Sequence, residues 1–176
     1  PVHLNFSFRE PLYPVEGQQL PAHALRGLSR WLDNHEPWTR YTPAQTACPT
    51  DPAWEVVRHS KGLIVVGQLT REEDAKAILQ LAEQTGWPLI TDIQSQLRFH
   101  PHAITYADLA LHHPEFRAEL AQAETLLLFG GRLISKRLQQ FLTEQEWQHC
   151  WQINSSAERL DNGLPVQQRF VSTISD

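Results

Sequence analysis

Two glycines, a serine and three basic residues, two of them adjacent, lie close together late in the sequence, within the run Gly130-Gly131-Arg132-Leu133-Ile134-Ser135-Lys136-Arg137. The run follows an apolar segment, which predicts a turn from a strand into a helix. Glycines permit unusual backbone angles and a close approach of other groups, and Ser135 can cap the helix. Lys136 and Arg137 then fall in its first turn, where the helix dipole disfavours cations by about 0.3 to 1 kcal/mol each.

An anion held by the helix amides and by these two side chains would offset that cost, and a carboxylate or a phosphate is the predicted ligand class. Lys136 and Arg137 are therefore our candidate substrate-binding residues. A solvated basic pair, or a salt bridge to a partner domain, would explain the same residues without a ligand. Both interpretations stay open.

Two further turns follow predicted strands. Gly67-Gln68-Leu69-Thr70 carries one glycine where a dinucleotide-binding turn needs three, so it predicts a tight turn rather than a pyrophosphate cradle. Thr70 is expected to cap the next helix, with Glu73 completing a capping box. The turn Thr91-Asp92-Ile93-Gln94-Ser95-Gln96 is polar directly after a buried strand, and its side chains could meet a ligand or another domain.

Nine histidines raise the question of a metal site. The closest pairs, His100 with His102 and His112 with His113, lack helical i, i+4 spacing and a nearby set of cysteines and carboxylates, so we predict surface or loop histidines. The chain also has no nucleophile elbow, P-loop or Cys-His arrangement in a recognisable context. We predict no catalytic, cofactor-binding or metal-binding residue in it.

Strands and helices alternate from Lys61 onward, which predicts an α/β fold with a Rossmann-like, doubly wound parallel sheet. Apolar and β-branched runs mark the strands, and apolar residues at helical spacing mark the helices. Strands are expected at 63–66, 89–91, 126–129, 150–153 and 169–172. Helices are expected from Thr70 to the cap at Gly86, at 106–112, at 115–123, and through Leu138, Phe141 and Leu142.

The first residues predict a strand with one buried face, because apolar and polar residues alternate over 2–8 while prolines follow and no hairpin partner is close. We expect 1–12 to be the final strand of a preceding domain, 13–60 an interdomain arm with a helix at 22–34, and 61–176 the central domain. Tryptophans in the arm would pack on a neighbouring domain or on their own: Trp31, Trp38 and Trp54. With no methionine present, we expect a piece of a longer protein.

Composition excludes several classes of protein. The chain has 176 residues, 41% of them hydrophobic, and a net charge of −5, which fits one globular domain and argues against nucleic-acid binding. No apolar run approaches the roughly 20 residues that cross a bilayer, and no signal peptide is recognisable. Cys48 and Cys150 show no paired spacing. A cytoplasmic location is the expectation.

Four segments resemble thiamine-diphosphate-dependent enzymes, most closely the synthases of the menaquinone pathway. Residues 1–13 are similar to the end of the pyrimidine-binding domain of that family. The other three segments are similar to its middle domain: Gly86-Trp87-Pro88-Leu89-Ile90 with Ser95-Gln96, the run 131–138, and Arg159-Leu160-Asp161. Ser7 departs from the family, which usually has proline there.

The resemblance implies three domains, with this middle domain between a pyrimidine-binding and a pyrophosphate-binding domain, in an enzyme that is homo-oligomeric when intact. It implies decarboxylation of 2-oxoglutarate on thiamine diphosphate and addition of the succinic semialdehyde unit to isochorismate, with Mg or Mn at the diphosphate. The family's activating glutamate and its Gly-Asp-Gly metal motif belong to the other domains, so this piece alone is expected to bind no cofactor and to be inactive. The family places the pair matching Lys136 and Arg137 toward the active site, where both substrates are dicarboxylates.

Two other functions compete with this one. A stand-alone nucleotide-binding domain is common among folds of this class, although the glycine pattern after Val66 is incomplete. Alternatively, the middle domain is mainly architectural, and Lys136 and Arg137 then affect assembly rather than turnover.

Overall fold

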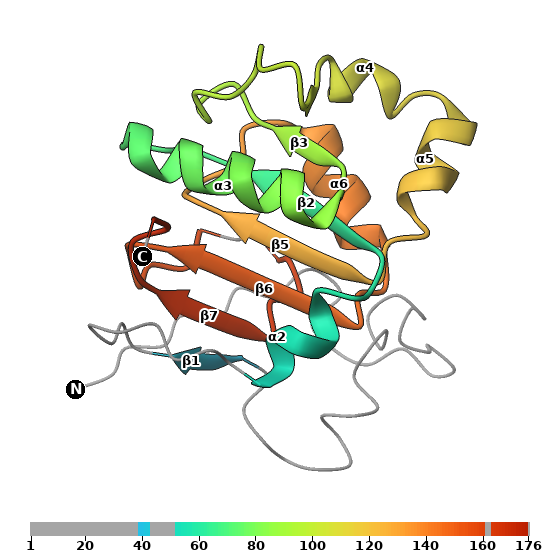
Figure 1. Ribbon diagram of the computed structural model, residues 1–176. Coiled ribbons are helices and arrows are strands. Elements are labelled where there is room, and N and C mark those ends of the chain that lie inside the picture. The colour runs from blue at the N-terminus through green and yellow to red at the C-terminus, as the bar shows by residue number, and fades with distance from the viewer. Residues whose placement is uncertain (1–38, 43–51, 161–162, 176) are drawn as a thin grey trace, which may run out of the picture. The chain divides into compact units, whose positions relative to one another are not determined.

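Seven parallel strands of the described residues form one sheet, and its two central strands are apolar on both faces. Figure 1 shows the sheet with its helices. The computed structural model describes residues 39–42, 52–160 and 163–175, all within the compact unit Pro37–Asp176. The central strands are buried throughout because helices cover both faces of the sheet. In the order of pairing, the strands are β1 (Arg40–Thr42), β7 (Gln168–Val171), β6 (His149–Asn154), β5 (Thr125–Phe129), β2 (Gly62–Val66), β3 (Leu89–Thr91) and β4 (Ala103–Ile104).

The strand order identifies the architecture. Counted from β2, the strands run 3-2-1-4-5-6, which is the order of the doubly wound Rossmann fold, and β1 extends the sheet beside β7. The predicted α/β class with a Rossmann-like parallel sheet is therefore confirmed. In such a sheet the order reverses between the first and fourth strands, here β2 and β5, and ligands usually bind outside the carboxyl ends of the strands at that point.

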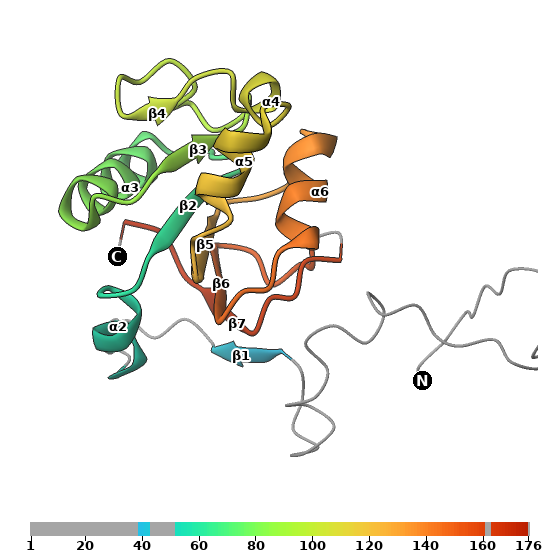
Figure 2. The ribbon, with the colours of Figure 1, turned by 90° about the vertical axis from the view of Figure 1, so that its right-hand side faces the viewer.

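Two apolar cores lie on opposite faces of the sheet because successive side chains of a strand point to opposite sides. Leu63 and Val65 of β2 pack with α4, α5 and α6, whereas Ile64 and Val66 pack with α2 and α3. Figure 2 shows the two helical layers on either side of the sheet. The helices are α2 (Pro52–Val57), α3 (Glu72–Thr85), α4 (Ala107–Ala110), α5 (Pro114–Leu120) and α6 (Lys136–Glu144).

Helix α3 begins later than predicted. Its N-cap is Arg71, not Thr70, and no side chain caps it. The amide of Leu69 donates to the carbonyl of Gln94 at 3.1 Å, and Leu69 is buried, so the chain stays extended for two more residues. Carboxylates in the first turn complement the dipole instead: Glu72, Glu73 and Asp74. The predicted C-cap at Gly86 is confirmed: Gly86 has φ 67°, and its amide donates a hydrogen bond to the carbonyl of Ala82.

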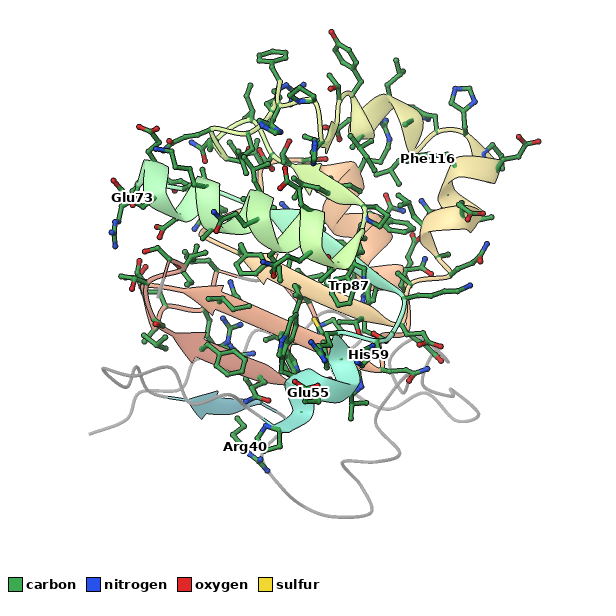
Figure 3. The ribbon with its side chains drawn as sticks, viewed as in Figure 1. Arg40, Glu55, His59, Glu73, Trp87 and Phe116 are labelled. Carbon is green, nitrogen blue, oxygen red and sulfur yellow. The ribbon has the colours of Figure 1, made fainter. Side chains whose placement is uncertain are left out.

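Parts of the range expected to be an arm belong to the described unit. Strand β1 pairs with β7, and the Trp54 ring of α2 lies edge-on to Trp87, with centroids 6.5 Å apart. Trp87, labelled in Figure 3, covers Gly62, where a Cβ would lie 2.2 Å from the indole. Trp54 thus packs on its own domain. Trp31, Trp38, the first strand and the helix at 22–34 lie outside the described residues.

Two features of the connections were not expected. The short strand β4 follows the loop after β3, and no helix occurs among the described residues between β6 and β7. Over the described ranges, no helix combines the length and apolarity that a membrane crossing needs.

Candidate functional site

The crevice at the switch between β2 and β5 is filled by two turns in direct backbone contact. The amide of Gly131 donates to the carbonyl of Gln68 at 2.9 Å. A Cβ on Gly67 would lie 2.3 Å from the Gly131 oxygen, and one on Gly130 would lie 2.4 Å from the Gln68 oxygen. The glycines do allow a close approach, as predicted, but the group that approaches is the other turn and not a ligand. A pyrophosphate has no room where Rossmann domains usually bind one.

Gly67→Ala is expected to destabilise the domain by about 2 to 3 kcal/mol, because the added methyl meets backbone that cannot turn aside. Gly86→Ala is the matched control, since φ is +67° there but a Cβ would meet nothing within 4 Å. It should cost only about 1 kcal/mol, from backbone strain. Urea unfolding of both variants measures the difference, and equal losses would contradict tight packing of the two turns.

The second polar turn contains a buried carboxylate that organises the third. Asp92 follows β3 and is 4% exposed. Its Oδ2 accepts hydrogen bonds from the amides of Ile134 at 2.6 Å and Ser135 at 3.2 Å, and its Oδ1 accepts one from Ile93 at 2.6 Å. The amides of Ile134 and Ser135, directly before α6, are therefore bound by an anion of the protein itself.

Ser135 and Arg137 connect this turn to α4. Ser135 caps α6 as predicted, its Oγ accepting a hydrogen bond from the amide of Leu138 at 3.0 Å, and its hydroxyl donates to the Asp108 carboxylate. Arg137 is half-buried, and its Nη1 donates to the main-chain carbonyl of Asp108 at 2.7 Å. Lys136 is exposed. The start of α6 is thus held from two sides, by Asp92 and by α4.

A pocket of about 230 Å³ lies beside this turn. Asp92, Asp108 and Ser135 contribute polar groups to it, and neither Lys136 nor Arg137 lines it. Apolar walls surround these groups, and one wall residue, Tyr106, has φ +61°, a strained value for a non-glycine residue. The predicted pair therefore flanks a pocket at the carboxyl edge without forming its walls.

Neither a metal nor a diphosphate fits the described residues. Within ranges 39–42, 52–160 and 163–175, no three side chains of His, Cys, Asp or Glu gather closely enough to hold an ion. His102 lies 3.6 Å from a Glu83 oxygen, and His112 and His113 are exposed. The first turn of α3, where a Rossmann domain binds pyrophosphate, carries the carboxylates of Glu72, Glu73 and Asp74, which repel an anion. The amides of Ile134 and Ser135, just before α6, are taken by Asp92.

The comparisons with known proteins identify the class of domain. A family model described as "Middle domain of thiamine pyrophosphate" matches residues 22–176. The chain belongs to this family of thiamine pyrophosphate enzyme middle domains. Curated relatives that match it are named 2-succinyl-5-enolpyruvyl-6-hydroxy-3-cyclohexene-1-carboxylate synthase, so the resemblance seen in the sequence is confirmed.

These relatives match nearly the whole chain. The synthase of Aeromonas salmonicida (strain A449) is 41% identical over 171 residues, which cover 97% of this chain and 30% of the relative. The synthase of Shewanella sp. (strain ANA-3) is 46% identical over 166 residues, which cover 92% of this chain and 29% of the relative. The synthase of Shewanella sediminis (strain HAW-EB3) is 42% identical over 176 residues, which cover 99% of this chain and 31% of the relative. The chain spans less than a third of the length of each.

Proposed function

We propose that this chain is the middle domain of a thiamine-diphosphate-dependent synthase that decarboxylates 2-oxoglutarate and adds the succinic semialdehyde unit to isochorismate. The observation that carries the proposal is identity of 41% and 46% to synthases of that name over almost the entire chain. The cofactor and its Mg or Mn ion would be held by other domains, because the described residues do not fit them. The full-length enzyme would be cytoplasmic and homo-oligomeric, and the chain alone inactive.

Within that enzyme, we propose that Lys136 and Arg137 bind substrate carboxylates. Two observations support this role. Among the described residues neither side chain forms an ion pair, so both charges are left for a ligand or a neighbouring domain. Asp92 holds the main chain directly before them, which fixes the position of the first turn of α6 from which both side chains extend. Both proposed substrates are dicarboxylates, and charge-assisted hydrogen bonds from Lys and Arg are the usual way to hold such groups.

An assay of the full-length protein tests the reaction. With thiamine diphosphate and Mg²⁺ supplied, we expect 2-oxoglutarate and isochorismate to disappear in equal amounts and one carbon dioxide to be released for each pair. Omitting either substrate or the cofactor should stop product formation. Consumption of 2-oxoglutarate with no dependence on isochorismate would assign the protein to a different reaction.

A nucleotide titration tests the competing function. NAD, FAD and ADP, added separately to the 176-residue chain in a calorimeter, are expected to produce no binding heat, because backbone fills the crevice that would hold the pyrophosphate. Saturable binding of any of the three would favour a stand-alone nucleotide-binding domain.

A further inference from the structure

Five large apolar side chains are exposed on the segments that follow β3, β4 and β5. They form what we call the apolar patch: Ile93 (62% exposed), Phe99 (79%), Tyr106 (62%), Leu109 (65%) and Ile134 (54%). Among the described residues, the one other large apolar side chain this exposed is Val56, on α2. Single exposed apolar residues are ordinary, but several gathered around one pocket mark an interaction surface.

The members of the patch are neighbours in space. Ile93, Tyr106 and Ile134 line the same pocket of about 230 Å³, and Leu109 lies one turn along α4 from Tyr106. Phe99 directly follows Arg98, which lines the same pocket, on the segment that joins β3 to β4. Figure 1 shows the connection from β3 to α4 on one side of the sheet, and in Figure 3 side chains from this region project away from the sheet.

The surroundings of the patch have the composition of an interface. Apolar side chains lie at its centre, and charged ones of both signs border it: Arg98, Asp92 and Asp108 line the pocket, and Lys136 is two residues from Ile134. A polar or charged rim around an apolar centre is typical of protein interfaces.

We infer that an adjoining domain of the same polypeptide covers the apolar patch in the full-length protein. The chain is a middle domain by family, and it spans 30% of the Aeromonas relative, so more than two thirds of such a protein lies outside it. The patch also adjoins the turn bearing Lys136 and Arg137, so a domain docked there would face the proposed substrate-binding pair. The inference rests on the part of the proposed function that makes this chain one domain of a longer enzyme, and does not depend on the reaction.

Hydroxyl-radical footprinting of the wild-type full-length protein tests the inference without a mutation. The rate at which each side chain is modified is divided by its rate in the urea-unfolded protein, which removes differences in intrinsic reactivity. We expect Phe99 and Tyr106 to be about tenfold more protected than Val56, since the centre of a docked interface excludes water. Equal reactivity of Phe99, Tyr106 and Val56 would overturn the inference.

Dilution distinguishes the source of the cover. Protection by a domain of the same polypeptide should be unchanged over a hundredfold dilution. Protection that disappears on dilution would overturn our inference in favour of a second copy. Because the readout is solvent access, it is independent of turnover: a covered patch in a protein that fails the synthase assay would refute the reaction and leave the docking surface standing.

A pair of charge variants gives a second readout in the full-length protein. Leu109→Lys places an ammonium in the proposed interface, whereas Val56→Lys makes the same change on α2 at equal exposure. We expect Leu109→Lys to lower the temperature of the first unfolding transition and Val56→Lys to leave it unchanged. Equal effects of the two variants would contradict docking at the patch.

Discussion

Arg137→Ala in the full-length protein is expected to lower kcat/KM for 2-oxoglutarate or isochorismate by about 100-fold, because a charge-assisted hydrogen bond to a carboxylate is worth about 1.5 to 3 kcal/mol. Of the five N–H donors that a guanidinium carries, the described part of the chain engages one, on the carbonyl of Asp108. The others are left for a substrate. Steady-state kinetics with each substrate varied in turn measures the loss.

Control variants distinguish a loss of substrate binding in Arg137→Ala from a general effect of net charge and from a loss of subunit assembly. Arg58→Ala makes the same change of charge on the stretch after α2, where Arg58 pairs with Glu55, and kcat/KM should stay within about twofold of wild type. Arg137→Lys keeps the positive charge but loses the planar guanidinium with its paired N–H donors, so it should retain part of the activity that Arg137→Ala loses. Unchanged kinetics for both substrates in Arg137→Ala, together with weakened subunit assembly, would show that the pair is architectural.

Asp92→Ala is expected to destabilise the 176-residue chain by about 4 kcal/mol, because three amide donors lose a buried carboxylate partner. For a domain of this size that loss corresponds to a fall in Tm of about 10 °C. Thermal unfolding followed by circular dichroism measures it. The same variant in the full-length protein should also raise KM, since the turn bearing Lys136 and Arg137 is no longer held.

Asp74 provides the matched control for this experiment. It is 6% exposed, against 4% for Asp92, but it accepts one amide, that of Ser175 at 3.2 Å. Asp74→Ala should cost about 1 kcal/mol and leave KM unchanged. If the two alanine variants lose the same stability, the three hydrogen bonds of Asp92 have no special weight in holding the turn.

Local patterns were sufficient to predict the centre of the fold. The run of four apolar residues at 63–66 and the similar one at 126–129 became the central strands, and the end of α3 at Gly86 followed from a glycine that adopts positive φ. A strand that is buried on both faces needs a continuous apolar sequence, so such strands can be predicted from the sequence alone. The edge strands β1 and β4 are three and two residues long, which is too short to show a periodic pattern of apolar residues.

The parts that could not be predicted depend on contacts distant in sequence. Thr70 has the residue type of a cap, but the hydrogen bond from Leu69 to Gln94 keeps the chain extended past it. Asp92 binds amides 42 and 43 residues further on, so only the fold brings the two turns together. A carboxylate directly after a buried strand was the available signal, and it was compatible with a ligand site or a structural one.

The glycine pair illustrates the same limit. Its conformational freedom was predicted correctly, and Gly130 adopts φ +77°. The identity of the approaching group was not predictable, because Gln68 lies on a different strand-to-helix turn, more than sixty residues earlier. Residue type therefore indicates that something comes close, while topology decides what it is.

The most direct measurement is one distance, from the Arg137 guanidinium or the Lys136 ammonium to the nearest substrate carboxylate oxygen, in a crystal structure of the full-length protein with 2-oxoglutarate or isochorismate bound. A middle domain that binds substrate requires about 3 Å for at least one of the two cations. Distances beyond about 8 Å for both, where salt screens the attraction between exposed charges, would contradict it.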